Sequence, residues 1–195
     1  HRVVSVAIPR STTEKLPDAP AQWRGRIDYR ALDRQLVALA ERPEMAGLAV
    51  AVVQNGKLTF VRTYGVADAV SGAPVTPNTL FRWASVSKTV TGAMATTLAK
   101  QDRLDLDRPV GAWRTSLRLP GGAEARISFA DLLSQRTGLT KNAYDEKLEE
   151  GQNSALLRSS YATAPLQCEP GTCHTYQNIA FDAASEILSE SAHQP

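Results

Sequence analysis

Histidine and cysteine are scarce in this chain of 195 residues, and their scarcity limits the chemistry that it can perform. The chain has three histidines, His1, His174 and His193, and two cysteines. A Ser-His-Asp triad would have to use His174 or a terminal histidine, which argues against this arrangement. No Gly-rich phosphate loop, dinucleotide fingerprint or metal-ligand cluster is present. We therefore expect neither a metal nor a cofactor.

Long apolar runs and runs of one charge are also lacking. No apolar stretch approaches the roughly 20 residues that cross a bilayer, so we expect no membrane span. The chain has 22 basic and 20 acidic residues. They are scattered, without the basic runs that are typical of nucleic-acid binding. The hydrophobic fraction of 43% and the charged fraction of 22% are those of a soluble globular domain.

The two cysteines lie close together in the segment Cys-Glu-Pro-Gly-Thr-Cys, from Cys168 to Cys173. This tight turn could bring the two thiols within bridging distance, and a disulfide would fit an exported protein. Two free cytosolic thiols remain the alternative. A zinc site is disfavoured because His174 is the one histidine nearby and no second ligand pair exists.

The first half of the chain predicts an arm, a helix and a hairpin. Residues 1–26 contain three prolines and little periodicity, which indicates an extended arm. Asp28 is a suitable N-cap for a helix that runs to Ala40. Residues 48–54 and 57–66 are largely apolar and rich in β-branched residues, and Asn55-Gly56 between them is a strong hairpin signal.

The second half predicts four more helices, over residues 85–100, 128–134, 154–162 and 178–189. In the first, Val86, Val90, Met94 and Leu98 line one face. Ser128 caps the second, which ends at Gly138. In the last, the expected inward-facing residues are Ile179, Ala183, Ile187 and Leu188. One hairpin beside five helices indicates an α+β fold whose sheet is unfinished, because an isolated hairpin is marginal in water.

Ser85 and Lys88 form the first candidate catalytic pair. Residues three apart lie on the same face of a helix, so the lysine amine would reach the serine hydroxyl. A neighbouring base activates a serine nucleophile, and a desolvated lysine can serve as that base. A Ser-x-x-Lys pair alone also arises by chance, and the alternative is a helix cap with a solvated lysine.

Tyr176 and Asn178 form the second candidate pair. Residues two apart in an extended segment point in the same direction. The phenol can relay a proton, and the amide can hold both a lysine and a substrate carbonyl. The alternative is a buried tyrosine next to a helix-capping asparagine.

Four segments resemble landmarks of the class C β-lactamase and low-molecular-weight penicillin-binding protein family, which also includes esterases. Residues 81–92 resemble its nucleophile segment, and residues 131–139 its landmark between the two motifs. Residues 55–57 with 64–68 resemble its opening hairpin, and residues 176–178 its Tyr-x-Asn box. The order and spacing match from about residue 45 to 190. The resemblance implies a β-lactamase/transpeptidase-like domain over residues 27–195 and a periplasmic or secreted location.

The resemblance also implies a mechanism. Ser85 would attack a lactam, amide or ester carbonyl and form an acyl-enzyme, with Lys88 and Tyr176 sharing the role of general base. Asn178 would hold Lys88 and a substrate carbonyl, and Asn142 matches a position that contacts the substrate. The expected partner is a β-lactam or D-Ala-type peptide.

One landmark of the family, a Lys-Thr-Gly or His-x-Gly box on a later sheet strand, is absent. Arg136-Thr137-Gly138 looks similar but precedes Tyr176 and lies inside the middle landmark. In the family, the oxyanion hole pairs the nucleophile's N–H with an N–H from that strand. We therefore expect residues 1–195 to be an incomplete domain that lacks the later strands, with the missing C-terminal segment as its partner.

Three hypotheses about function follow. The first is a serine hydrolase that acts on β-lactams or D-Ala-type peptides, with small esters as the alternative substrates. The second is a non-catalytic penicillin-sensing or partner-binding domain, and the third is an inactive chain. Substrate turnover together with a Ser85→Ala control would separate the three.

Overall fold

The computed structural model describes residues 27–193. They fall into two compact units that divide between Arg82 and Trp83, and each unit is described by itself. The extended arm predicted for residues 1–26 lies outside the described residues.

The first unit consists of helix α1 (Tyr29–Ala40) and an antiparallel hairpin of β1 (Gly47–Gln54) and β2 (Lys57–Gly65). The Asp28 carboxylate caps α1 by accepting the backbone N–H groups of residues 30 and 31, each at 3.0 Å. Asn55 and Gly56 have positive φ angles of 51° and 74°, as a two-residue loop of this type requires. The predicted helix and hairpin are confirmed.

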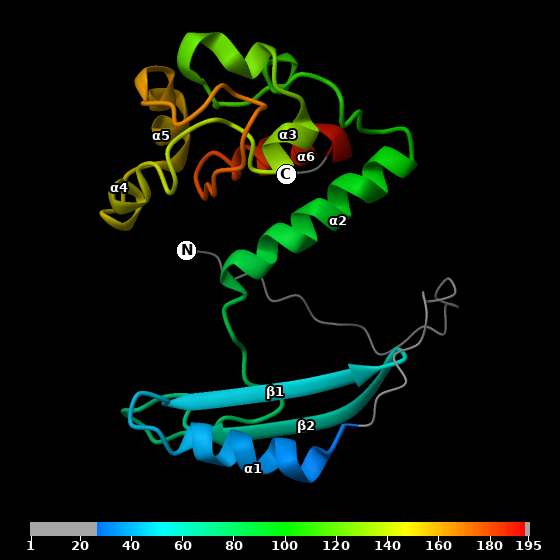
Figure 1. The fold of residues 1–195 in the computed structure, drawn as a ribbon, viewed down its shortest axis with the longest axis vertical. Coiled ribbons are helices and arrows are strands. Elements are labelled where there is room, and N and C mark those ends of the chain that lie inside the picture. Colours follow the sequence, from blue (N-terminus) through cyan, green and yellow to red (C-terminus); the bar gives the residue numbers. More distant parts are fainter. Residues whose placement is uncertain (1–26, 194–195) are drawn as a thin grey trace. The chain divides into compact units, whose positions relative to one another are not determined.

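Helix α1 covers one face of the hairpin (Figure 1). The Tyr29 ring stacks on Phe60 with 5.3 Å between ring centroids, and Tyr64 donates a hydrogen bond of 2.6 Å to Asp33 on the helix. Side chains of β1 alternate between half-buried and exposed. Only a small core results, and its buried apolar residues are Leu36, Phe60 and Val75.

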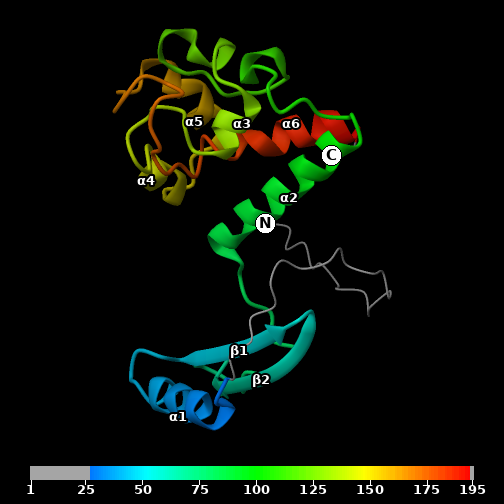
Figure 2. The ribbon, with the colours of Figure 1, turned by 45° about the vertical axis from the view of Figure 1, so that its right-hand side comes forward.

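The described residues of the second unit contain helices and irregular segments and no strand. Its elements are η1 (Ala84–Val86), α2 (Ser87–Lys100), η2 (Val110–Ala112), η3 (Pro120–Ala125), α3 (Phe129–Leu133), α4 (Asp145–Glu149), α5 (Ser154–Ser160), η4 (Tyr161–Thr163) and α6 (Ala183–Ala192). Helices α2 and α6 lie side by side (Figures 1 and 2). Helix α4 was not predicted from the sequence.

Most of the helix boundaries differ from the prediction by a few residues. The last helix begins at Ala183 and not at Asn178, because residues 178–182 form tight turns; the N–H of Ala184, for example, donates to the carbonyl of Phe181 at 2.9 Å. Helix α3 ends at Leu133, and Gln135, with φ 64°, takes the left-handed conformation expected of the terminating residue.

Gly138 was predicted to end this helix, but in the structure it serves another purpose. A Cβ atom at this position would lie 2.6 Å from the carbonyl oxygen of Cys168. Its φ of 80° is also a conformation that favours glycine. Gly138 therefore permits the close approach of the cysteine loop.

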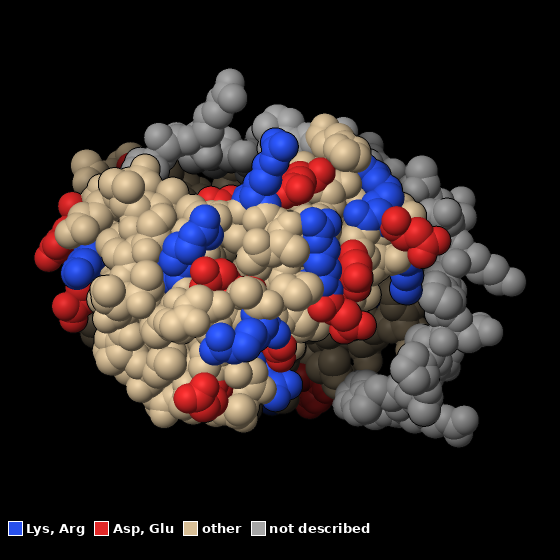
Figure 3. All heavy atoms as spheres, turned by 90° about the horizontal axis from the view of Figure 1, so that it is seen from above, with Lys and Arg blue, Asp and Glu red and all other residues tan. Residues whose placement is uncertain are grey.

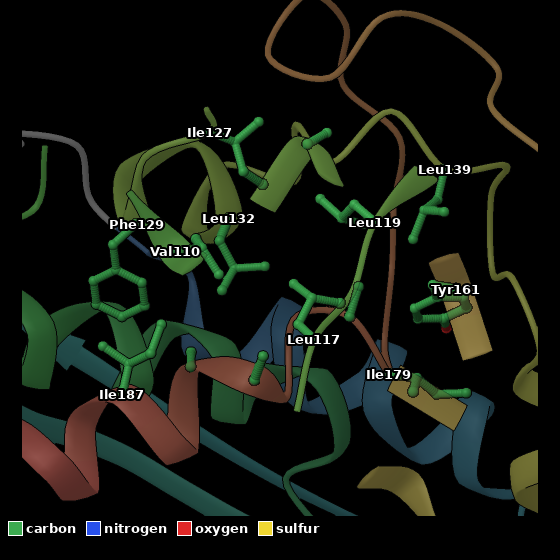
Figure 4. Packing of buried hydrophobic residues seen from close by; sticks show 14 of the residues in the cluster. Val110, Leu117, Leu119, Ile127, Phe129, Leu132, Leu139, Tyr161, Ile179 and Ile187 are labelled. Carbon is green, nitrogen blue, oxygen red and sulfur yellow. The ribbon is translucent and has the colours of Figure 1, made fainter. Parts of the chain in front are cut away.

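The core of the second unit lies between α6, α3 and the irregular segments (Figure 4). Side chains from separate segments meet there with less than 2% exposure, among them Val110, Leu117, Leu119, Phe129, Leu132, Leu139, Tyr161, Ile179 and Ile187. The predicted inward-facing residues of the last segment, Ile179, Ala183, Ile187 and Leu188, are all buried.

Helix α2 buries less of its predicted apolar face than expected. Leu98 is buried, but Val86, Val90 and Met94 are 61%, 40% and 50% exposed. Within the described residues, α2 packs against α6 near its C-terminal half, where Ala95 and Leu98 are buried. The predicted apolar face is therefore largely exposed toward the N-terminal end of the helix.

The described part of the chain has one two-stranded sheet beside its helices, so the α+β class is confirmed. None of its helices has the length and apolar character needed to cross a bilayer. On the face in Figure 3, basic and acidic side chains are interspersed, and neither sign forms a continuous patch.

Candidate active site

Ser85 is the middle residue of the 3-10 turn η1, which directly precedes α2. The turn begins at Ala84, whose φ of 44° is unusual for a residue with a side chain. The change of direction places the Ser85 hydroxyl one turn before Lys88. The Lys88 amine lies 3.4 Å from the Ser85 Oγ, in agreement with the spacing argument.

Tyr176 reaches the same hydroxyl from a distant segment. Its Oη lies 2.5 Å from the Ser85 Oγ, and the Lys88 Nζ lies 4.8 Å from the centre of its ring. Hydrogen bonding to Lys88, and then to Ser85, lowers the pKa of the Tyr176 phenol, although burial and the charge of Asp145 oppose this effect. The phenol is therefore a better candidate for a proton-accepting phenolate than an ordinary tyrosine.

Asn178 completes the group. Its Oδ1 accepts a hydrogen bond of 2.7 Å from the Lys88 Nζ, and its Nδ2 donates one of 2.6 Å to the Asp145 carboxylate. The four residues named from the two sequence motifs thus lie together. Asp145, which the sequence analysis did not name, is a fifth member of the group.

Gln135 fixes the segment that carries Tyr176 and Asn178. Its side-chain amide donates to the carbonyl of Gln177 at 3.1 Å and accepts from the N–H of Gln177 at 2.8 Å. Gln177 is fully buried, while its two neighbours point to the opposite side, toward Lys88. Gln135 lies within the middle landmark, but this function was not predicted for it from the sequence.

Replacing Gln135 with alanine is expected to lower the free energy of unfolding by about 2–6 kcal/mol, because two buried backbone groups of Gln177 each lose their hydrogen-bond partner, and leaving one such group unsatisfied costs about 1–3 kcal/mol. Gln135→Glu should lose part of this amount, since a carboxylate accepts the N–H but repels the carbonyl. Urea unfolding followed by tryptophan fluorescence measures the loss. The control is Gln152→Ala on the surface; a midpoint for Gln135→Ala equal to that of the control would contradict the prediction.

The segment before Tyr176 is also attached at its cysteine loop. Cys168 and Cys173 are joined by a disulfide in the structure. The N–H of Gly171 donates to the carbonyl of Arg136 at 2.8 Å, and the N–H of Thr175 donates to that of Gln135 at 2.9 Å. The loop therefore lies against the same short segment, residues 135–138, that aligns Gln177.

Asn142 lies next to the site and is exposed. Its backbone N–H donates to the carbonyl of Tyr176 at 2.9 Å, but its side chain makes no hydrogen bond within residues 27–193. Across the same residues, no group of three or more His, Cys, Asp or Glu side chains could hold a metal ion. The arrangement is suited to activating a hydroxyl group through an amine and a phenol.

Comparisons with known proteins agree on a family. A family model described as Beta-lactamase matches residues 32–195. A β-lactamase of Pseudomonas fluorescens is 32% identical over 84% of this chain, and Esterase EstB of Burkholderia gladioli is 30% identical over 81%. The chain spans about 44% of the length of these two relatives.

Solved structures show the same fold. A class C β-lactamase aligns with a TM-score of 0.72 and 26% identity, over 85% of this chain and 45% of that protein. An octameric penicillin-binding protein homologue from Pyrococcus abyssi aligns with a TM-score of 0.73 and 21% identity, over 86% of this chain and 40% of that protein. The helices and the hairpin are therefore part of a β-lactamase/transpeptidase-like fold. With the family model covering most of its length, this chain belongs to the β-lactamase family.

Proposed function

We propose that the protein is a serine hydrolase that forms an acyl-enzyme on Ser85. The observation that carries the proposal is the position of the Ser85 hydroxyl, 2.5 Å from the Tyr176 Oη and 3.4 Å from the Lys88 Nζ. A hydroxyl in contact with both a phenol and an amine has two possible proton acceptors. No other serine in the described residues has such neighbours.

In the first half of the reaction, the Ser85 Oγ forms a bond to the substrate carbonyl carbon. Its proton passes to the Tyr176 Oη or the Lys88 Nζ, and the same proton then passes to the leaving nitrogen or oxygen when its bond to the carbonyl carbon breaks. Asn178 keeps Lys88 beside the nucleophile and can offer its amide to a substrate carbonyl. Water attacks the ester of Ser85 in the second half, and the hydroxyl regains its proton.

The substrates that we propose are β-lactams, D-Ala-type peptides or related amides. Small esters are the second candidate, since one of the relatives of about 30% identity is an esterase. A domain that is acylated but does not turn over is the third. The disulfide between Cys168 and Cys173 supports a periplasmic or secreted location.

We also propose that residues corresponding to the rest of the relatives' length complete the catalytic domain. This chain spans less than half of those relatives, and the described residues offer two strands of sheet. Activity is therefore to be measured on the protein as its gene encodes it.

A labelling experiment tests the proposed function. The protein is incubated with a fluorescent penicillin, a chromogenic cephalosporin or a p-nitrophenyl ester, and the labelled peptide is mapped by mass spectrometry. We expect an adduct on Ser85 and none in Ser85→Ala, with Ser87→Ala, two residues away, as the matched control. Labelling that persists in Ser85→Ala, or no labelling and no turnover of any of these compounds, would refute the proposal.

A further inference from the structure

Asn178 makes two hydrogen bonds whose directions depend on how its amide is oriented. The Oδ1 accepts from the Lys88 Nζ at 2.7 Å, and the Nδ2 donates to the Asp145 Oδ2 at 2.6 Å. Rotating the amide by 180° would place its NH2 group against the lysine donor and its oxygen against the carboxylate. Both contacts would become repulsive, so the carboxylate selects one orientation.

Asp145 is itself held firmly. It is the first residue of α4, and its N–H donates to the carbonyl of Asn142 at 3.1 Å. Just before it, the Tyr144 ring stacks on Tyr161 with 5.0 Å between centroids. The hydroxyl of the buried Tyr161 donates to the carbonyl of Ala143 at 2.7 Å. The start of α4 is therefore attached to the core, and the carboxylate has a fixed position.

The carboxylate of Asp145 has one hydrogen-bond partner for its side chain in residues 27–193. Its Oδ1 is buried and accepts no hydrogen bond there, and it forms none of the ion pairs of this part of the chain. Burying a carboxylate with so few partners costs free energy. The first turn of α4 favours a carboxylate, but Glu146 lies in the same turn, whereas the contact that orients the Asn178 amide is made by Asp145.

We infer that Asp145 is a positioning residue, which orients the Asn178 amide so that its oxygen holds the Lys88 amine beside Ser85. The inference rests on the proposed function, because it assigns a task in the activation of Ser85. Asp145 touches neither the nucleophile nor Lys88 by a hydrogen bond. Its effect passes through Asn178.

Asp145 also acts on the site by its charge. Three groups from three elements influence Tyr176: Lys88 from α2, Ser85 from η1 and Asp145 from α4. The first two lower the pKa of the phenol, and the charge of Asp145 raises it. Asp145→Asn removes the charge but keeps an oxygen that can accept from the Asn178 amide. The pKa of Tyr176 should then fall, and the limb of the acylation profile that depends on it should move to lower pH.

The experiment compares Asp145→Ala and Asp145→Asn with matched changes at Glu146. Glu146 lies in the same first turn of α4 and is exposed, so Glu146→Ala and Glu146→Gln reproduce the loss of a helical carboxylate. The rate of Ser85 acylation by a fluorescent penicillin or a p-nitrophenyl ester is measured as a function of pH, and thermal melts verify folding. Asp145→Ala should slow acylation about 10- to 100-fold, the usual effect of a misplaced reacting group.

Asp145→Asn should be acylated at close to the rate of the unmodified protein, and the limb of its pH profile that depends on Tyr176 should lie at lower pH. Both Glu146 variants should have the rate and the pH profile of the unmodified protein. Equal rates for Asp145→Ala and Glu146→Ala would overturn the inference while the proposed function stands. The inference would also be overturned if Asp145→Asn were acylated as slowly as Asp145→Ala and its pH profile were unshifted. If the unmodified protein is not acylated on Ser85, the proposed function itself fails. If Asp145→Ala does not fold, the acylation rate and the pH profile of Asp145→Asn alone decide whether the inference holds.

Discussion

Replacing Lys88 with methionine is expected to slow acylation of Ser85 by about 100- to 10 000-fold, the range over which a general base contributes. Methionine has a similar length but no amine, so the 3.4 Å contact with the Ser85 Oγ is lost. The replacement should also raise the pKa of Tyr176, because Lys88 is the largest cause of its lowered pKa. With that cause removed, the phenol holds its proton more tightly and accepts the serine proton less readily.

Lys88→Arg separates two possible functions of the amine. Arginine keeps a positive charge near Tyr176 but cannot give up its proton at ordinary pH. If Lys88 accepts the Ser85 proton, the arginine variant should be nearly as slow as Lys88→Met. If Lys88 serves through its charge alone, arginine should restore a large part of the rate, and Tyr176→Phe should then be the slower variant.

The rates come from stopped-flow or gel-based labelling with the fluorescent penicillin, under conditions that saturate binding. Lys100→Met is the matched control, because Lys100 is an exposed lysine at the opposite end of α2. Its rate should equal that of the unmodified protein. A Lys88→Met variant that labels as fast as this control would exclude Lys88 from the activation of Ser85.

Local signals predicted most of the elements and the two halves of the candidate site. Asp28 and Ser128 cap the helices that were expected from them, and Asn55-Gly56 forms the turn of the hairpin. These features depend on residues a few positions apart. The approach of Lys88 to Ser85 is of the same kind, since it follows from the spacing of the two residues along the chain.

The residues that were missed act over long distances along the chain. Asp145 meets Asn178 across 33 positions, and Gln135 meets Gln177 across 42. No periodicity or cap signal reports such a contact. The predicted start of the final helix, at residue 178, was too early for a related reason. Ile179 and Ala183 are both buried, as an apolar helix face would be. However, Ile179 is brought inward by the turns of residues 178–182 and not by a helix.

Arg158 is the second residue whose replacement should have a large effect, in this case on stability. Its side chain is 4% exposed, and its guanidinium forms ion pairs with Asp182 and with Glu186, the latter at 2.7 Å. Its Nε donates to the Ser116 Oγ, also at 2.7 Å. Arg158→Met keeps much of the side-chain volume but leaves the two carboxylates without their cation. Breaking a buried pair in this way costs about 3–5 kcal/mol. The partial exposure of both acids places the expected loss at the lower end of that range.

The same replacement should change how stability depends on pH. Burial raises the pKa of Glu186, but hydrogen bonds from Ser116, Thr115 and Arg158 outweigh it, so that the pKa lies below its ordinary value. A carboxyl whose folded pKa is lowered stabilises the fold above its unfolded pKa, and this contribution is lost as the pH falls through the folded pKa. Arg158→Met removes one of the lowering causes, so the acid-induced loss of stability attributable to Glu186 should be smaller and should be complete at a higher pH.

Urea midpoints measured between neutral and acidic pH test both parts of the prediction. Arg114→Met is the matched control, because the Arg114 side chain is exposed and its contact with Glu190 is made by the backbone N–H. We expect the Arg158 variant to be much less stable than the control near neutral pH, and the gap between them to narrow as the acids are protonated. A gap that stays constant down to acidic pH would mean that the loss comes from packing and not from the ion pairs. Equal midpoints for the two variants at neutral pH would show that the buried network adds no stability to the unit that carries the site.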